Sequence, residues 1–154
     1  YCGWQNLNNA PTVNFQPGVY VFKGGGVNVN GGTWTGTGVT FYFADTSYIQ
    51  FNGTVKLNLT APTTGTYANL LWYEASNLAK TSFTMNATNG ANMEGLMYLP
   101  SRNLTLNAGA SVTSNKLTMV LNTLIANQVS WTLDSSNKTI AASGSAASGV
   151  YLKR

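Results

Sequence analysis

The sequence contains no histidine, a single cysteine and few charged residues. Without histidine, the chain has no Ser-His-Asp triad, no imidazole general base and no ordinary zinc site. The single cysteine, Cys2, excludes an internal disulfide and a cysteine-type zinc site. Charged residues make up 8% of the 154 residues, far below the usual value of about a quarter. Asn, Thr, Ser and Gly must therefore supply solubility, which is more typical of exported β-rich proteins than of cytosolic enzymes.

Acidic residues are scarcer than basic ones, with four against eight and a net charge of +4. The basic residues are scattered along the chain, whereas a nucleic-acid surface requires a clustered patch, so we do not expect a nucleic-acid partner. No Walker or Rossmann glycine pattern is present. Calcium-binding repeats need a recurring aspartate, and this chain has only Asp45 and Asp134. We therefore expect no cofactor and no metal.

The sequence also lacks an apolar run of the roughly 18 residues that a membrane-spanning helix needs. Because it begins with Tyr1 and not with Met, we interpret the chain as an excised or processed fragment. On this interpretation a partner for Cys2, and any membrane anchor, lie upstream.

Three sets of short segments recur in a constant order along the chain. The first set is strongly apolar and comprises residues 19–22, 39–43, 69–73, 95–99 and 117–121. The second set alternates apolar and polar residues and comprises residues 27–30, 48–51, 82–85, 103–107 and 123–126. The third set comprises residues 33–35, 55–59, 91–93, 111–113 and 129–133. Three strands per repeat of about 20–30 residues predict an all-β parallel β-helix, or β-solenoid, of about five to six coils.

The alternation also predicts which side chains face the core. Val27 and Val29 should point inward, as should Leu104 and Leu106. The first set is apolar on both faces, so we expect its outer face to be covered. Glycines are predicted at the corners of the coil, where the backbone needs positive φ or close approach, at positions 24–26, 31–32, 36, 38, 53 and 109.

We expect one domain over residues 1–154, with residues 1–15 at its N-terminal edge. Residues 60–68 and 74–81 are predicted to protrude as loops, and the second of these has the composition of one helical turn. Residues 141–149 read as a small-residue linker that leads to a last strand or to a tail.

Two carboxylates are the best candidates for acid–base chemistry. Asp45 and Glu74 each follow a first-set strand and would lie one coil apart, near Lys23 and Arg102. Such a pair would suit polysaccharide cleavage. The alternative is a structural charge ladder at a corner, which we favour because nothing in the sequence supplies a pocket. Glu94 lies at the opposite end of its strand and should not join them.

Aromatic and threonine side chains suggest two binding surfaces. Trp34, Trp72, Tyr73 and Tyr98 are candidates for an outward surface that binds a partner or a glycan, although core packing is expected for most aromatic residues. Outward threonines suggest the flat arrays of an ice-binding solenoid, but the T-x-T pattern does not repeat coil after coil. These threonines are Thr33, Thr35, Thr37, Thr40, Thr105 and Thr113.

The succession "QPGVYVFKGGGVNVNGGTWTGTGVTFYF", "VKLNLTAPTTGTYANLLWY" and "MEGLMYLPSRNLTLNAG" covers most of residues 16–122. It resembles the glycine-rich C-terminal region of TadG-like proteins of the bacterial tight-adherence (Flp/Tad) pilus system. The resemblance implies an exported or envelope-spanning protein with an N-terminal membrane anchor and a role in pilus assembly or adhesion. It brings no catalytic residues. The run "YANLLWYEA" departs from the glycine-bearing run that follows the loop in that family.

The leading hypothesis is a non-enzymatic structural or adhesive module located outside the cell, on its surface or in the periplasm. Its partners would be protein subunits of a pilus or envelope assembly, a second copy of the chain, or surface glycans. One alternative is a carbohydrate-binding or carbohydrate-cleaving β-helix that uses Asp45 and Glu74. The other is a self-assembling or ice-binding-like solenoid, because an uncapped solenoid end has unpaired strand edges.

Overall fold

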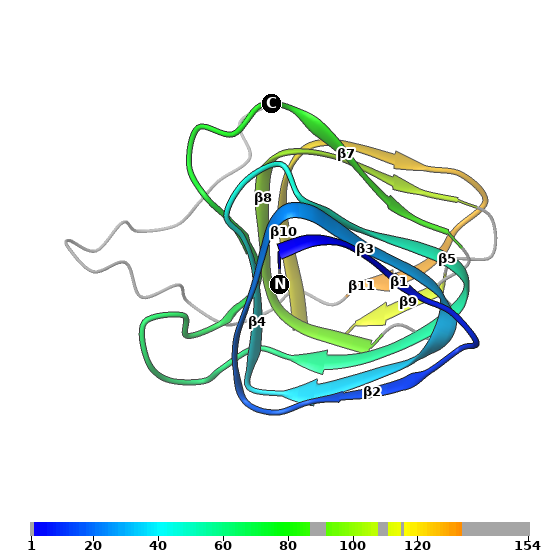
Figure 1. Cartoon of the computed structure of the whole chain (residues 1–154), viewed down its shortest axis with the longest axis horizontal. Helices are drawn as coiled ribbons and strands as arrows, with labels where there is room; N and C mark the ends of the chain where they lie inside the picture. The colour runs from blue at the N-terminus through cyan, green and yellow to red at the C-terminus, as the bar shows by residue number, and fades with distance from the viewer. Residues whose placement is uncertain (1, 87–91, 108–110, 115, 134–154) are drawn as a thin grey trace.

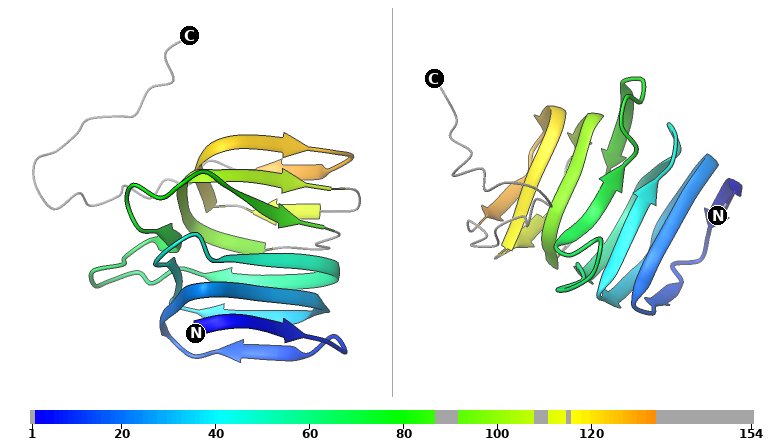
Figure 2. Two further views of the ribbon diagram at one scale, coloured as in Figure 1. Left: turned by 45° about the horizontal axis from the view of Figure 1, so that its top comes forward. Right: turned by 90° about the vertical axis from the view of Figure 1, so that its left-hand side faces the viewer.

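Each strand of the chain lies parallel to a strand one coil away in the sequence (Figure 1). The computed structural model describes residues 2–86, 92–107, 111–114 and 116–133, with backbone alone at 111–114 and 131–133. These residues form an all-β solenoid of about five turns, which confirms the predicted fold class. Figure 2 shows the coils stacked in chain order from one end of the molecule to the other.

The strands are long because several of them run through a corner without a break. They are β1 (Cys2–Leu7), β2 (Thr12–Phe15), β3 (Gly18–Thr37), β4 (Val39–Phe43), β5 (Tyr48–Thr60), β6 (Leu70–Glu74), β7 (Thr81–Met85), β8 (Asn92–Leu106), β9 (Ser111–Ser114), β10 (Lys116–Ala126) and β11 (Ser130–Leu133). After β1 and β2, coil 1 is β3, coil 2 is β4 with β5, coil 3 is β6, β7 and the start of β8, coil 4 is the rest of β8 with β9, and coil 5 is β10 with β11.

The coils present three faces, which correspond to the three sets of segments in the sequence. The first face comprises β4, β6 and residues 18–22, 95–99 and 116–121. The second face comprises β1, β7 and residues 26–30, 48–52, 102–106 and 123–126. The third face comprises β2, β9, β11 and residues 33–37, 55–60 and 92–94.

The core is a continuous column of inward side chains from all three faces. Val29 pairs in register with Phe51, Phe51 with Met85, and Met85 with Leu106, and all four side chains are buried. Val27 and Leu104 are buried as well, as the alternation predicts. Each fully buried aliphatic or aromatic side chain of this kind contributes about 1.5–3 kcal/mol. No single coil encloses this core, so the stacking of coils is what buries it.

Glycines turn the corners at most of the predicted positions. Positive φ angles are found at Gly24, Gly26, Gly31, Gly32, Gly38 and Gly53. At Gly32 a Cβ atom would lie 2.3 Å from the carbonyl oxygen of Pro11, so this corner also needs the absence of a side chain. Gly36 has no positive φ and lies inside β3, and position 109 is outside the described residues.

Two connections leave the coil on the side of the first face (Figure 1). The first joins β5 to β6 over residues 61–69, where a loop was predicted at 60–68. The second occupies residues 75–80, because Glu74 ends β6 and Thr81 begins β7. It contains a turn and no helix, so the helical alternative was wrong. Residues 141–149 lie outside the described residues. Within the described part of the chain, no helix has the length and apolar character to cross a membrane.

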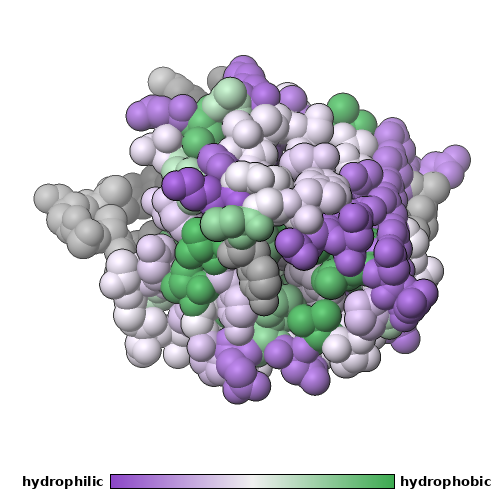
Figure 3. Space-filling view, viewed as in Figure 1, coloured by the Kyte–Doolittle hydropathy of each residue, from purple (hydrophilic) through white to green (hydrophobic). Residues whose placement is uncertain are grey.

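The strands β1 and β2 form the N-terminal end of the described core. Among the described strands, β1 and β2 each pair with β3 alone. Between them lies a hollow of about 160 Å³ lined by Gln5, Leu7, Val13, Phe15, Phe22, Val27 and Trp34. Figure 3 looks onto this end and shows hydrophobic residues near its middle. Residues 2–15 therefore form the N-terminal edge of the described solenoid.

Candidate functional site

Asp45 is part of the corner that follows β4. Its carboxylate accepts hydrogen bonds from the backbone N–H groups of Ser47 and Gly24, both at 2.8 Å, and from the Ser47 hydroxyl. The Ser47 hydroxyl is the main reason that the pKa of Asp45 lies below its ordinary value. The backbone donors and the charge of Lys23 act in the same direction, and partial burial opposes them. The side chain thus holds its own corner and that of the preceding coil.

Glu74 occupies a core position at the end of β6. It pairs in register with Phe43, so its side chain points inward, and it is only 1% exposed. Its Oε2 accepts a hydrogen bond from Arg102 Nε at 2.8 Å. Its Oε1 accepts bonds from the Ser101 backbone N–H at 2.6 Å and hydroxyl at 2.7 Å. Every donor that reaches this carboxylate in the structure belongs to coil 4.

Arg102 is completely buried and connects three successive coils. Besides its ion pair with Glu74, it donates from Nη2 to the carbonyl of Asp45 at 2.9 Å and from Nη1 to that of Thr46 at 3.2 Å. Its guanidinium carbon lies 5.3 Å from the centroid of the Phe43 ring. A buried cation is costly unless it is paired and hydrogen-bonded, and these contacts supply both conditions.

The two predicted carboxylates therefore meet at one corner without forming a pair. Asp45 binds donors of its own and the previous coil, whereas Glu74 binds donors of the next coil, and Arg102 bridges them. The sequence favours a charge ladder on an exposed corner, and the ladder is instead partly buried. Glu94 does not join them, as predicted, and lies 3.7 Å from the ammonium group of Lys116.

Both tryptophans proposed for an exposed surface lie in the core, so this prediction was wrong. Trp34 is 1% exposed and Trp72 is 0% exposed. Trp34 pairs in register with Leu57, and Trp72 with Phe41, so both side chains point inward. The two indole N–H groups are buried and have no acceptor among the described residues. Trp72 stacks on Phe41 with a centroid separation of 4.7 Å.

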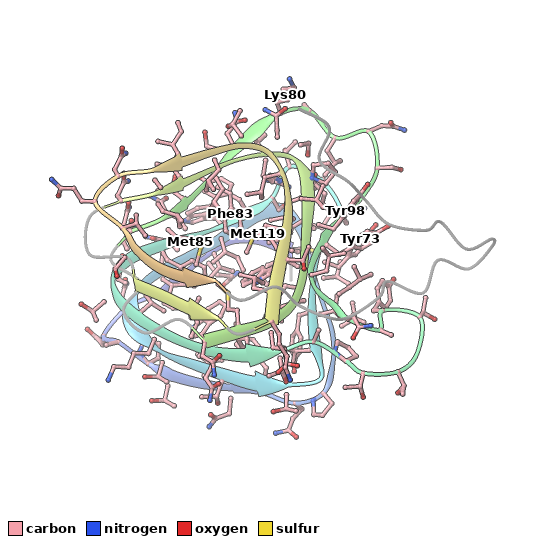
Figure 4. The ribbon with its side chains drawn as sticks, turned by 180° about the vertical axis from the view of Figure 1, so that it is seen from behind. Tyr73, Lys80, Phe83, Met85, Tyr98 and Met119 are labelled. Atoms are coloured by element: carbon pink, nitrogen blue, oxygen red, sulfur yellow. The ribbon has the colours of Figure 1, made fainter. Side chains whose placement is uncertain are left out.

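The other two predicted residues, Tyr73 and Tyr98, lie side by side on the outer side of the first face (Figure 4). Their ring centroids are 6.0 Å apart, and those of Tyr42 and Tyr73 are 5.4 Å apart. We call these three residues the tyrosine ladder. Val21 precedes it and Val120 follows it in register, and both are exposed. Tyr73 and Tyr98 are the two members that were predicted for a binding surface, and Tyr98 is 38% exposed.

The loops partly cover this outer face, as expected from its apolar composition. Tyr67, in the connection from β5 to β6, lies 6.2 Å from Tyr73 between ring centroids. Separately, the 75–80 connection forms one wall of a hollow of about 440 Å³ beside the ladder. The residues that line this hollow include Tyr73, Leu78, Lys80, Tyr98, Pro100 and Ser101.

An asparagine ladder runs along the corner between the second and third faces, and the sequence reasoning missed it. Each side-chain amide nitrogen donates a hydrogen bond to the side-chain oxygen of the ladder asparagine that comes before it in the sequence, at 2.6–3.3 Å. The ladder runs from Asn127 through Asn107, Asn86, Asn52 and Asn28 to Asn6. Hydrophilic residues gather along this corner, at the right of Figure 3. The signal is present in the sequence, because an asparagine either ends or directly follows each second-set segment.

The threonines do not form a flat array. Thr33 lies in register between Thr12 and Lys56, and Thr35 between Asn14 and Asn58. Thr40 is buried on the first face, where its hydroxyl donates to the carbonyl of Leu70 at 2.7 Å. Thr37 and Thr60 are neighbours on the third face, and Thr105 pairs with Thr84 on the second. The side chain of Thr113 lies outside the described residues.

Among the described residues, no group of three histidine, cysteine or carboxylate side chains is arranged to hold a metal ion. The chain matches no family model, and searches of curated proteins and of solved structures find no similar protein.

Proposed function

We propose that the chain is a non-enzymatic structural or adhesive module of an exported or pilus-associated bacterial surface protein. The tyrosine ladder is the observation that carries this proposal. It places Tyr42, Tyr73 and Tyr98 in one outward column, flanked by Val21 and Val120. Aromatic side chains on a rigid frame present a large contact area at low cost in conformational entropy, which suits recognition of a partner.

The frame behind this column supports a role that depends on stiffness. The asparagine ladder links neighbouring coils along one corner, and Arg102 links three coils at another. Stacked aromatic residues fill the core between them. The strands of each coil pair with those of its neighbours, and Arg102 also reaches from coil 4 to coil 2, so these cross-coil bonds resist bending and local opening.

The arrangement of the carboxylates also supports a structural role. A general base must have a lone pair directed at the substrate. Glu74 is buried and directs its oxygens at Arg102 and Ser101, and Asp45 directs its oxygens at Ser47 and Gly24.

The proposed location is the cell surface, the extracellular space or the periplasm. The proposed partners are subunits of a pilus or envelope assembly, a second copy of the chain, or surface glycans. The resemblance to TadG-like proteins and the scarcity of charged residues support this assignment.

Bead adhesion tests the proposal. Beads carrying the protein would be applied to isolated envelopes and sheared pili of a bacterium with tight-adherence pili. We expect Tyr73→Ser/Tyr98→Ser to reduce bound beads about tenfold or more, as for the loss of an interface hot spot. The matched control, Thr33→Ala/Lys56→Ala, changes two outward neighbours on the third face and should retain adhesion. Equal adhesion of both variants would count against the proposal, as would polysaccharide turnover that Glu74→Gln abolishes.

A further inference from the structure

The second face is split between coil 2 and coil 3. Residues 48–52 pair fully with coil 1, and β7 pairs fully with β8. Between β5 and β7 the described residues make one pair, Phe51 with Met85. Figure 2 shows β7 following β8 and diverging from β5 toward its start. The strand ladder is thus open from the corner at Asp45 to the pair at Phe51.

The path of the chain explains the split. The 75–80 connection is longer than the equivalent connections 44–47 and 100–101, and it detours outside the coil. On the first face, bonds between coils 2 and 3 continue up to Ala75 N–H with the Phe43 carbonyl, and they resume at Asn86 N–H with the Phe51 carbonyl. The carbonyls of the intervening corner accept from Arg102 of coil 4 instead. At this corner Arg102 therefore links coil 4 directly to coil 2.

The split forms a surface cleft of about 430 Å³. Its lining consists of neutral hydrogen-bonding side chains, namely Thr46, Tyr48, Gln50, Thr81, Ser82 and Thr84. The hydroxyl oxygen of Thr81 is buried and has no partner among the described residues.

We propose that this cleft binds a short stretch of a neutral oligosaccharide. Sugar hydroxyls both donate and accept hydrogen bonds, and so do the hydroxyls and the amide that line the cleft. The Tyr48 ring supplies apolar surface for the carbon face of a sugar.

Other ligand classes fit this lining less well. An ionic ligand would lose hydration without meeting an opposite charge among the six lining residues. A peptide strand would need pockets for its alternate side chains, and the lining offers polar groups in their place. This inference deepens the proposed function and rests on it for glycans as partners, and it assigns them to a cleft on a different face from the tyrosine ladder.

Titration of the full chain with three neutral trisaccharides tests the inference. The probes are maltotriose, cellotriose and triacetylchitotriose, with trigalacturonate as the acidic comparison. Amide resonances would be followed by NMR at millimolar sugar. We expect saturable shifts with at least one neutral probe, confined to residues 46–50 and 81–84. No saturable shift with any neutral probe would overturn the proposal, as would shifts that map elsewhere or equal binding of the acidic probe.

Matched variants then locate the site. Thr84→Val removes a hydroxyl from the cleft and should weaken binding about three- to tenfold. Thr105→Val makes the same change at the neighbouring register position on the same face, outside the cleft, and should leave binding unchanged. Thr84→Ser keeps the hydroxyl and should retain binding, which separates loss of a contact from loss of the fold. Equal weakening by the two valine variants would overturn the assignment, and so would weak binding of Thr84→Ser.

Discussion

The guanidinium group of Arg102 donates a hydrogen bond to the carbonyl of Asp45 at 2.9 Å, although the two residues belong to coils 4 and 2. The same side chain also forms an ion pair with Glu74 of coil 3. Coil 3 leaves the stack at this corner through its 75–80 connection, and the arginine takes the place of the missing backbone donors. One side chain therefore joins three coils at the point where the regular ladder is interrupted.

Removal of this arginine should destabilise the fold strongly. Arg102→Met leaves the buried carboxylate of Glu74 without its ion partner, and we expect the free energy of unfolding to fall by about 3–5 kcal/mol. Urea denaturation measures this change. The control is Lys116→Met at the exposed ion pair with Glu94, where the loss should stay below about 1 kcal/mol.

The double variant Glu74→Leu/Arg102→Met sharpens this test. Because it removes both charges together, it should be less destabilised than the sum of the two single variants. Additive losses, or a loss in Arg102→Met no larger than in the control, would contradict a structural role for the buried pair.

The asparagine ladder should stabilise its interior positions more than its end. Asn52 donates to Asn28 at 2.7 Å and accepts from Asn86 at 3.0 Å, whereas Asn127 makes one ladder bond and is exposed. We expect Asn52→Ala to lower the free energy of unfolding by about 1–3 kcal/mol, because it leaves half-buried amides unpaired. Asn127→Ala should cost less than about 1 kcal/mol. Equal costs in urea denaturation would show that the bonds do not act as a continuous ladder.

The solenoid could be predicted because the sequence patterns that specify it lie within short segments of the chain. Alternation with a period of two assigns Val27, Val29, Leu104 and Leu106 to the core, and all four are buried. The constant order of the three segment sets then implies coils, since no coil can bury its inward side chains alone. The corner glycines follow from the same reasoning, and most of them have positive φ.

The residues that the sequence misplaced depend on register between coils. Trp34 lies in segment 33–35, which is too short for its alternation to show which side chains point inward. Its pairing in register with Leu57 of the next coil places it inside. Glu74 is inward because its strand continues in register from Phe43, and a partner 28 residues later makes this tolerable. The general expectation that charges face water gave the opposite answer. The split of the second face also depends on how neighbouring coils match, because connection 75–80 of coil 3 is longer than connection 44–47 of coil 2.

Acid should remove the contribution of Asp45 to stability. Its pKa in the folded protein is lowered from the ordinary value of 3.8, so the unfolded chain binds more protons between the two values. The stabilisation is therefore complete above the ordinary value and is lost as the pH falls through the folded-state pKa. Asp45→Asn should be less stable than the wild type at neutral pH, and the difference should shrink in acid.

Thermal unfolding across the acid range measures this convergence. Ser47→Ala provides the matched variant, because it removes the hydroxyl that contributes most to the shift. NMR titration of the Asp45 carboxyl carbon should show its pKa rising toward the ordinary value in that variant. A constant stability difference between wild type and Asp45→Asn at all pH values would contradict the expectation.

The corner at Gly32 should tolerate a side chain less well than an open turn does. Gly32 has a φ of +107°, and a Cβ atom there would lie 2.3 Å from the Pro11 carbonyl oxygen, which accepts a hydrogen bond from the Thr33 N–H at 3.1 Å. Gly65 has a φ of +86° in the connection from β5 to β6, and a Cβ atom at this position would meet nothing within 4 Å. Gly65→Ala therefore reports backbone strain alone, about 1–2 kcal/mol.

Gly32→Ala adds to that strain a displacement of the chain at the start of β2. We expect it to lower the free energy of unfolding by at least about 1 kcal/mol more than Gly65→Ala does, because the half-buried backbone hydrogen bond from Thr33 to Pro11 is stretched as well. Urea denaturation compares the two, and hydrogen exchange at the Thr33 amide should accelerate in Gly32→Ala only. If the two variants lose the same stability and the Thr33 amide stays protected, the N-terminal edge (residues 2–15) shifts enough to accept a methyl group, and close packing between this edge and coil 1 does not hold this corner.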